Sequence, residues 1–304
     1  ILRAIGRMDA PAKPFRMPLL NTLAFILRHP LNRAHPVDAL IRFAKWQVGS
    51  RLVPGPVVFE WVNGARFIVR RGETGLTGNV YCGLHEFADM AYVLHVLRPD
   101  DLFVDIGANV GSYTVLACAA KKAHGICVEP IPSTFERLLD NLAINDLFQR
   151  VEALNVGLGD QPGRLEFTSG SNCTNHVVTS GEASLPTVNV EVTTLDEALD
   201  GRVPSLIKID VEGFELPVLR GAPGTLANPR LNSIIMELNG SGSRYGYDEG
   251  EILHLMREYG FASFTYEPYT RQLIPCEGKN SSSGNTIFIR DEETIRARLA
   301  DAEK

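Results

Sequence analysis

From residue 102 onward, short apolar segments of strand length alternate with longer segments whose apolar residues recur at helical spacing. The expected strands span residues 102–106, 125–128, 151–156, 205–209 and 233–236, and the expected helices span residues 110–120, 133–145, 214–221 and 249–259. Such alternation is typical of βαβ units, because a parallel neighbour strand can be reached only by a crossover connection. The pattern therefore predicts an α/β fold with a doubly wound, mostly parallel sheet.

The chain before this alternating region is organised differently. Residues 1–56 are interrupted by prolines and are expected to form short helices, because proline lacks an amide donor and stops a helix. The dipeptide Asn63-Gly64 readily adopts the positive φ angles of a tight turn, which predicts a β-hairpin around it. We predict an accessory N-terminal segment at residues 1–82, a main domain at residues 83–290 and a C-terminal helix at residues 291–304.

Several further segments complete the predicted organisation. Residues 86–97 have apolar positions at helical spacing until Pro99. Two strands flank the polar stretch 169–184, which has too little apolar content to pack and is expected to form a loop beside a site. Two antiparallel edge strands are expected near the end of the main domain, at residues 261–266 and 286–289.

The first strand of the alternating region ends in a glycine-rich turn, Asp105-Ile-Gly-Ala-Asn-Val-Gly111. Ligands of open α/β sheets bind where the carboxyl ends of parallel strands meet. Glycines allow close approach of the backbone, but this segment lacks the middle glycine of GxGxxG that makes room for a pyrophosphate. The turn therefore favours a nucleoside cofactor without pyrophosphate, with Asp105, Gly107, Asn109 and Gly111 as candidate binding residues. The alternative is a turn that joins strand to helix and binds nothing.

The second strand ends in Glu129-Pro130, roughly 20 residues after the turn. An acidic side chain at this spacing can accept hydrogen bonds from both hydroxyls of a ribose. We therefore predict that Glu129 and Pro130 contact the cofactor. The alternative is a solvated carboxylate at a strand end.

Carboxylates also follow the fourth and fifth strands. Asp210, Glu212 and Glu215 lie at and just beyond the end of the fourth strand, and Glu237 ends the fifth. Carboxylates this close repel one another unless a cation, a hydrogen-bonding ligand or helix amides compensate. Asp210 and Glu237, with waters, provide the donors that magnesium prefers. The alternative is that Asp210 caps the next helix and the two glutamates only favour its N-terminus.

Three further side chains are weaker candidates. His85 and Glu86 begin the helix before the first strand, where they are expected either to face the pocket or to cap the helix. His176 lies in the polar loop, where it is expected either to act as a base or to be solvated.

Between about residue 83 and residue 289, the chain resembles the FkbM family of methyltransferases. The resemblance rests on motifs in order, namely Gly83-Leu-His-Glu86, Asp105 to Gly111, Glu129-Pro130 followed by Asn141, Thr194-Leu-Asp196, Lys208-Ile-Asp-Val-Glu-Gly213 with Glu215, and Glu237. It implies a Rossmann-like class I methyltransferase fold with a seven-stranded sheet, S-adenosylmethionine as methyl donor, and a hydroxyl of a sugar or polyketide-like natural product as acceptor. His85 stands where the family usually has an aromatic residue.

Together these features predict an S-adenosylmethionine-dependent O-methyltransferase. An aliphatic hydroxyl is a poor nucleophile, so it needs a base or a Lewis acid such as magnesium. The catalytic candidates are Asp210, Glu212, Glu237 and His85, and Glu86 and Asp210 are also expected to contact the cofactor. One alternative is a non-catalytic regulatory protein that binds the same cofactor, and another is a nicotinamide-dependent oxidoreductase.

Charge and cysteine content limit the partners. Acidic residues outnumber basic ones by six, and basic residues scattered along the chain disfavour nucleic acid. Five cysteines without a CxxC pair argue against a disulfide framework and a zinc ribbon, which favours the cytoplasm. No apolar run approaches the ~20 residues of a membrane helix. A chain that begins with Ile1 is expected to lack its natural N-terminus. A homodimer is compatible with the sequence, which specifies no oligomeric state.

Overall fold

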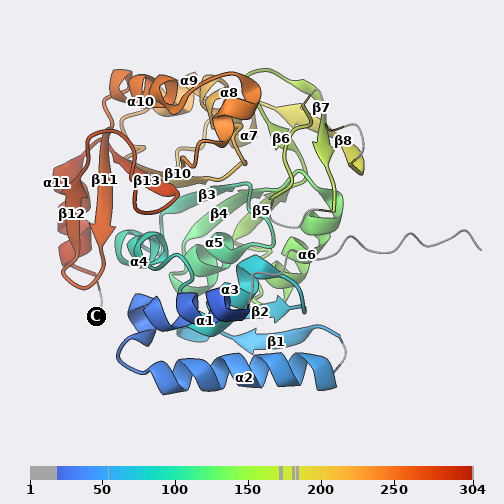
Figure 1. Ribbon diagram of the computed structural model, residues 1–304. Helices are drawn as coiled ribbons and strands as arrows, with labels where there is room; N and C mark the ends of the chain where they lie inside the picture. The colour runs from blue at the N-terminus through green and yellow to red at the C-terminus, as the bar shows by residue number, and fades with distance from the viewer. Residues whose placement is uncertain (1–18, 54, 171–173, 180–181, 183–184, 303–304) are drawn as a thin grey trace, which may run out of the picture.

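The computed structural model describes residues 19–53, 55–170, 174–179, 182 and 185–302. Its centre is an eight-stranded mixed sheet with the strand order β12-β11-β13-β10-β9-β3-β4-β5 (Figure 1). Five adjacent strands are parallel: β3 (Leu102–Ile106), β4 (His124–Val128), β5 (Val151–Leu154), β9 (Leu206–Ile209) and β10 (Ser233–Glu237). The predicted doubly wound α/β fold is therefore confirmed.

One edge of the sheet is antiparallel. The strands there are β13 (Asn285–Ile289), which pairs with β10, then β11 (Ala262–Glu267) and β12 (Gln272–Pro275). The seven strands expected for a class I methyltransferase fold are present, and β12 adds an eighth at the edge. Strand β12 was not predicted, because a four-residue segment that ends in proline carries little strand signal.

Helices cover both faces of the sheet, as Figure 1 shows. One face carries α4 (Phe87–Val96), α5 (Ser112–Val115) and α6 (Pro132–Ala143), and the other carries α7 (Leu195–Leu199), α8 (Glu215–Arg220), α9 (Pro223–Ala227) and α10 (Glu249–Glu258). Each face has its own apolar core. The helix expected at residues 110–120 is α5 followed by a π-helical turn, Leu116–Ala120. The sheet is thus buried on both sides, as its apolar central strands require.

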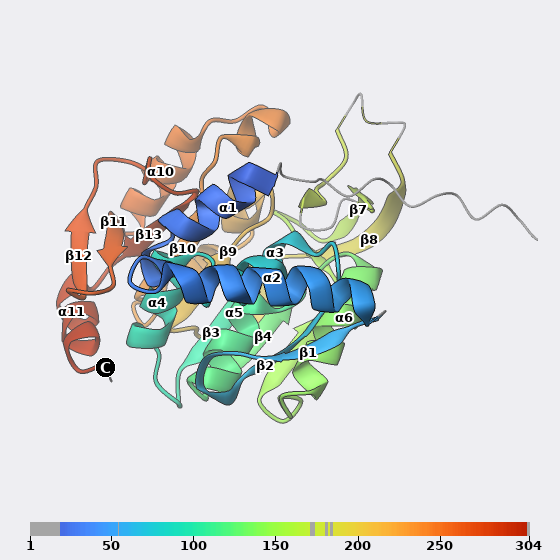
Figure 2. The same cartoon turned by 60° about the horizontal axis from the view of Figure 1, so that its bottom comes forward.

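The N-terminal part packs beside the helices of the first face (Figures 1 and 2). Its elements are α1 (Leu19–Arg28), α2 (Pro36–Leu52), β1 (Val57–Glu60), β2 (Arg66–Val69) and α3 (Thr74–Cys82). The predicted hairpin is confirmed, and both Asn63 (φ 50°) and Gly64 (φ 78°) have positive φ angles. The expectation of short helices is wrong for α2, because Pro36 begins that 17-residue helix rather than ending one. Residues 1–18 lie outside the described residues.

The polar stretch expected to lie beside a site comes between two strands of a second, smaller sheet. Its strands, in the order β6-β8-β7, are β6 (Gly157–Leu158), β7 (Gly163–Thr168) and β8 (Thr187–Thr193). Residues 171–173, 180–181 and 183–184 lie outside the described residues, and Cys173 is among them. The four described cysteines are unpaired.

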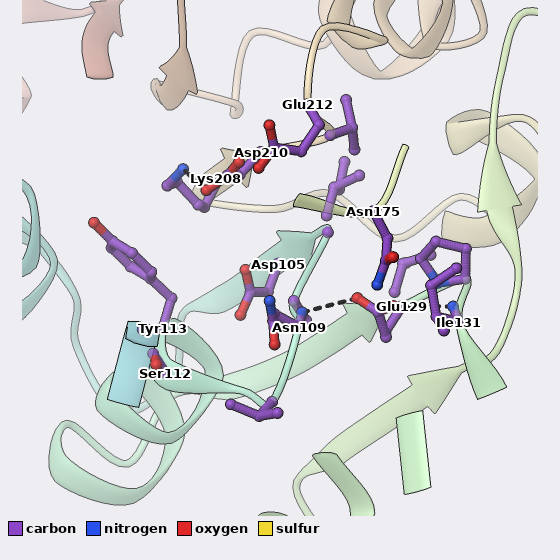
Figure 3. A pocket seen from close by; sticks show the side chains of 18 of the residues that line it. Asp105, Asn109, Ser112, Tyr113, Glu129, Ile131, Asn175, Lys208, Asp210 and Glu212 are labelled. Carbon is purple, nitrogen blue, oxygen red and sulfur yellow. Dashed lines mark hydrogen bonds and ion pairs between the residues drawn. The ribbon is translucent and has the colours of Figure 1, made fainter. Parts of the chain in front are cut away.

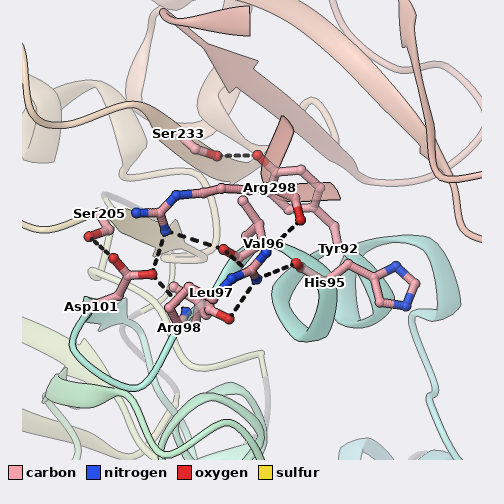
Figure 4. A network of polar contacts seen from close by, with 9 residues as sticks. All are labelled: Tyr92, His95, Val96, Leu97, Arg98, Asp101, Ser205, Ser233 and Arg298. Carbon is pink, nitrogen blue, oxygen red and sulfur yellow. Dashed lines mark hydrogen bonds and ion pairs between the residues drawn. The ribbon is translucent and has the colours of Figure 1, made fainter. Parts of the chain in front are cut away.

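The C-terminal helix α11 (Glu292–Ala300) is tied to the main sheet by a polar network (Figure 4). Arg298 forms an ion pair with Asp101. The Asp101 carboxylate also accepts hydrogen bonds from the Arg98 amide (2.7 Å) and the Ser205 hydroxyl (2.8 Å). The helix is therefore anchored on the loops that precede β3 and β9. Among the described residues, no helix is long and apolar enough to cross a membrane.

Candidate active site

A cavity of about 300 Å³ lies at the carboxyl ends of β3, β4, β9 and β10. Figure 3 shows side chains from the ends of β3, β4 and β9 converging on it. Among the sequence candidates, Asp105, Gly107, Asn109, Glu129, Pro130, Asp210, Glu212, Glu237, His85 and Glu86 all line the cavity. The fold therefore brings together residues that are up to 152 positions apart in the sequence.

The glycine turn forms the floor of this cavity. The amides of Gly107 and Ala108 both donate to the Val128 carbonyl (3.0 and 2.9 Å), which ties the turn to β4. Gly107 has a φ of 76°, and a Cβ atom there would lie 1.8 Å from the Asp210 carbonyl oxygen. The backbone after β3 thus touches the backbone after β9, and only glycine permits this contact.

Two predicted cofactor-binding residues have structural partners of their own. Gly111 does not line the cavity, and a Cβ atom there would lie 2.6 Å from Leu138, so its role is close packing against α6. Asp105 accepts hydrogen bonds from the Thr114 amide (2.9 Å) and hydroxyl (2.6 Å), which fixes the start of α5. Burial raises the pKa of Asp105 to about 6.

Glu129 holds the turn in place with both carboxylate oxygens. The Asn109 amide donates to Oε2 (3.0 Å) and the Ile131 amide donates to Oε1 (2.9 Å), as Figure 3 shows for Asn109. Burial raises the pKa of Glu129 to about 7, although these two amides favour the carboxylate. Each oxygen keeps a second lone pair for a ligand.

A cluster of charged side chains lines the other half of the cavity. Asp210, Glu212 and Glu237 offer oxygen atoms that lie within 4.8 Å of one another. The ammonium of Lys208, which is 1% exposed, lies 3.1 Å from Asp210 Oδ2. Burial alone lowers the pKa of Lys208, but the negative charges around it, that of Asp210 first, outweigh burial and raise it. Lys208 is therefore a fixed cation that pairs with the Asp210 carboxylate.

The surroundings of Glu237 and Glu212 raise the proton affinity of both side chains. Burial and the charge of Asp210 raise the pKa of Glu237 to about 9, so this carboxyl group is neutral at pH 7. Its Oε2 atom is buried and has no hydrogen-bond partner among the described residues. Burial, with the charge of Asp210, raises the pKa of Glu212 to about 7. Two of the three carboxyl groups in the cluster, Glu212 and Glu237, thus have raised pKa values.

Glu215 does not belong to this cluster. It accepts hydrogen bonds from the amides of Gly213 (3.1 Å) and Val211 (3.4 Å) and begins α8. The alternative that it favours a helix N-terminus is therefore correct for Glu215. Asp210 does not cap α8, because Phe214 is the residue that precedes the helix.

The start of α4 forms the wall opposite Asp210. Glu86 accepts hydrogen bonds from the Tyr113 hydroxyl (2.7 Å) and from Asn285 Nδ2 (3.1 Å). The ring of His85 packs edge-on against Phe25 at 5.2 Å between centroids. Burial lowers the pKa of His85, so its ring is neutral at pH 7. Both residues therefore line the cavity, His85 with a neutral ring and Glu86 with a hydrogen-bonded carboxyl group.

His176 is not suited to act as a base. Its Nδ1 lies 2.9 Å from the Thr174 carbonyl oxygen, and its Nε2 lies 2.9 Å from Glu182 Oε1. Both ring nitrogens are engaged by oxygen atoms of the same loop, and His176 does not line the cavity. Its neighbour Asn175 lines the cavity instead (Figure 3).

Two contributors to the site were not predicted. One is Lys208, which begins the motif Lys208 to Gly213 but was assigned no role, because a lysine inside an apolar strand does not by itself indicate a partner. The other is α3, from which Gly75, Leu76 and Asn79 line the cavity. Asn79 is 1% exposed, its Oδ1 accepts a hydrogen bond from the His85 amide (2.8 Å), and its Nδ2 has no partner among the described residues. The N-terminal part therefore supplies a wall of the cavity and a donor available to a ligand.

Comparisons with known proteins identify the family of the chain. The profile of the Methyltransferase FkbM domain matches residues 105–263. Hexuronic acid methyltransferase AglP of Haloferax volcanii is 30% identical over 169 residues, which is 55% of this chain and 65% of the relative. Methyltransferase sdnD of Sordaria araneosa is 28% identical over 44% of this chain and 65% of its own length. The matches thus span slightly less than two thirds of each relative.

Among solved structures, a SAM-dependent methyltransferase from Agrobacterium tumefaciens is similar with a TM-score of 0.40. It is 10% identical, and the superposition covers 78% of this chain and 70% of that chain. A Pyrococcus horikoshii protein, TYW2 in complex with MeSAdo, is similar with a TM-score of 0.37 and 16% identity, over 78% of this chain and 70% of that chain.

Proposed function

The chain belongs to the FkbM methyltransferase family, and from that premise we propose that it is an S-adenosylmethionine-dependent O-methyltransferase. The proposed acceptor is a hydroxyl of a small saccharide or polyketide-like natural product. One observation carries the proposal. Glu129 lies in the cavity beside the glycine turn that suits a nucleoside cofactor, and the Asp210 carboxylate and its partner Lys208 lie opposite. A pure binder has no need of this clustered charge.

The cavity divides into two parts that suit the two ends of the donor. Ile131, Val156 and Leu158 form an apolar lining beside Glu129, which suits an adenine ring above a ribose. Glu86 and the free donor of Asn79 lie at the other end, and together they suit the ammonium and carboxylate of an amino acid. S-adenosylmethionine would supply a methyl group on a sulfonium, a cation that the carboxylates favour.

Methyl transfer to oxygen forms a carbon–oxygen bond, breaks a carbon–sulfur bond and releases the hydroxyl proton. We assign acceptance of that proton to Asp210, which Lys208 holds as a carboxylate at 3.1 Å. Glu237, which is neutral at pH 7, is available to donate a hydrogen bond. Glu212 lies beside Glu237 in the same cluster. Positioning of the hydroxyl behind the carbon–sulfur bond supplies much of the remaining acceleration. His85 shapes the wall and takes no proton.

The name of the Haloferax relative supports a sugar as the acceptor. Hexuronic acids present several hydroxyl groups, and Asp210, Glu212 and Glu237 provide polar side chains where the acceptor is proposed to bind. A saccharide is therefore the acceptor class favoured over a polyketide-like compound.

Calorimetry tests the assigned cofactor. S-adenosylhomocysteine should bind with a Kd of about 1 to 100 μM, and NAD should give no heat, because the turn lacks room for a pyrophosphate. Binding of NAD without S-adenosylhomocysteine would favour the oxidoreductase instead. Binding of S-adenosylhomocysteine, but no turnover of the donor with any acceptor, would favour the regulatory protein.

The affinity for S-adenosylhomocysteine should depend on pH through Glu129. A ribose hydroxyl donates to the carboxylate, so binding favours its ionised form. The pKa of Glu129 is raised to about 7, and the affinity should therefore be constant well above pH 7 and fall by up to about tenfold per unit below it. Calorimetry between about pH 5.5 and 8.5 measures the slope.

The matched variant for this test is Glu129→Gln. It keeps one oxygen for a backbone amide and has no titrating group, so its affinity should be lower and nearly independent of pH. Other carboxyls near the cavity titrate in the same range, among them Asp89 and Glu212, with pKa values raised to about 7. If the variant keeps the full slope, Glu129 is not the group responsible.

A magnesium ion is a second means of neutralising the negative charge of the carboxylate cluster. Three carboxylates in reach and the unpartnered Oε2 of Glu237 fit the donor set that magnesium prefers. Asp210 and Glu237 would hold the ion, which would act as a Lewis acid on the hydroxyl. Because Lys208 and a protonated Glu237 already compensate Asp210, we expect turnover to remain within about twofold after treatment with a chelator. Loss of activity and its recovery with magnesium would assign the activation to the metal.

A further inference from the structure

The charge of the chain is divided unevenly. Residues 1–53 contain nine of the 30 basic residues and two of the 36 acidic ones, so the first sixth of the chain carries +7 and the remainder −13. The expectation that basic residues are scattered is therefore wrong for the N-terminal part. In the described part of this segment, residues 19–53, the basic side chains are Arg28, Arg33, Arg42, Lys45 and Arg51, and Asp38 is the one acidic side chain. None of these five cations forms an ion pair with a described residue.

The same segment exposes apolar side chains. Of the 15 large apolar side chains exposed among the described residues, 11 lie between residues 19 and 58. On α2, four of them are 45 to 75% exposed: Val37 (66%), Ile41 (45%), Val48 (56%) and Leu52 (75%). With exposed Ala44, their spacing of three or four residues places them on one face along the whole helix.

The opposite face of α2 packs against the protein. Ala39 on that face is fully buried, and Phe43 contacts Tyr81 of α3 at 5.2 Å between ring centroids. The helix lies at the outside of the molecule (Figures 1 and 2). It packs against α3, which lines the cavity. The exposed apolar face of α2, called the α2 stripe below, consists of Val37, Ile41, Ala44, Val48 and Leu52. It is thus a free surface among the described residues, and it does not contribute to the core.

Two occupants that belong to the chain itself fit this surface poorly. A second copy would bring another +4 surface against the first, because the described segment carries five cations and one anion. Residues 1–18 add four basic residues and one acidic residue, so they carry the same sign as the stripe. A partner with negative charge beside an apolar layer complements both properties, and an anionic lipid surface has this chemistry.

We propose that α1 and α2 dock the protein on an anionic membrane surface, with the α2 stripe in the boundary between headgroups and acyl chains. Basic side chains at the rim of the stripe, such as Lys45 and Arg51, would contact lipid phosphates. In this arrangement the protein binds at the membrane interface, and α1 and α2 do not span the bilayer. Because α3 joins α2 to the cavity wall, the active site would stand one helix above the lipid. The proposal does not depend on the proposed methyl transfer.

Co-sedimentation of the full chain with vesicles tests the proposal. Vesicles of phosphatidylcholine with about 30% phosphatidylglycerol should bind the protein, pure phosphatidylcholine should bind much less, and salt should weaken binding. The variant Val37→Ser/Ile41→Ser/Val48→Ser/Leu52→Ser should lose about tenfold or more in affinity. The control Phe148→Ser/Ile274→Ser changes side chains that are 56% and 48% exposed on other elements and should bind like the parent.

The outcomes separate the possible occupants. Calorimetry with S-adenosylhomocysteine reports whether the stripe variant remains folded, independently of lipid. Absence of vesicle binding, or equal binding by the stripe variant, would overturn the proposal. Light scattering that shows a dimer of the parent and a monomer of the stripe variant, without vesicle binding, would assign the surface to a second copy and would likewise overturn it.

Discussion

Asp210→Asn should lower kcat by about a thousandfold or more, because it removes the group that takes the hydroxyl proton and keeps the shape of the side chain. The affinity for S-adenosylhomocysteine should change by no more than about threefold, since that product has no proton to release. Steady-state kinetics and calorimetry on the same preparation measure both quantities. Retention of full turnover would show that Asp210 does not take the proton.

Glu237→Gln is the matched control for this prediction. Glu237 has a pKa raised to about 9, so a neutral amide resembles the carboxyl group present at pH 7, and kcat should fall by less than about tenfold. A loss as large as that of Asp210→Asn would mean that Glu237 acts as an ionised ligand, as the magnesium arrangement requires.

The Asp210 variant leaves Lys208 buried without its closest anion. Removal of one partner of a buried ion pair is destabilising by about 3 to 5 kcal/mol where nothing replaces it. Here Glu237 and Glu86 also act on Lys208, so Glu237 is available to ionise in compensation. Urea denaturation of Asp210→Asn therefore accompanies the kinetics, and a folded variant with lost turnover isolates the chemical effect.

Gly107→Ala should destabilise the protein by about 3 kcal/mol, because a Cβ atom there meets the Asp210 carbonyl oxygen at 1.8 Å and the residue has a positive φ. A side-chain movement cannot relieve this contact, because the contacting atom belongs to the backbone at the end of β9. The change should also displace Asp210 and weaken cofactor binding. Urea denaturation measures the first effect, and calorimetry measures the second.

Gly163→Ala provides the comparison. A Cβ atom at Gly163 meets nothing within 4 Å, and this glycine has no positive φ, so the free energy of unfolding should change by less than about 0.5 kcal/mol. If both variants unfold at the same urea concentration, the turn after β3 does not depend on contact with β9.

Local patterns predicted most of the fold. Apolar segments of the right length gave β3, β4, β9 and β10, because strands buried on both faces need continuous apolar residues. The carboxyl ends of parallel strands share one edge of the sheet. The strand pattern therefore predicts one common site for the residues at these ends, namely Asp105, Glu129, Asp210 and Glu237.

Features that arise only from tertiary contacts were not predictable. Helix α3 contains Gly75 and Gly78 and has little helical signal, yet packing against α2 and β2 forms it and brings Asn79 into the cavity. The proton on Glu237 follows from burial and from the charge of Asp210, neither of which is visible in the sequence. Gly111 was assigned to the cofactor because it belongs to the motif, whereas its position against Leu138 gives it a packing role.

The most direct test of the account is transfer of a labelled methyl group from S-adenosylmethionine to a panel of hydroxylated glycosides, hexuronic acids included, read by mass spectrometry. The account predicts a product that carries the label on a hydroxyl oxygen, with one S-adenosylhomocysteine released per product, and neither product with Asp210→Asn. Label found on carbon or nitrogen, or transfer that Asp210→Asn sustains at the parent rate, would contradict it.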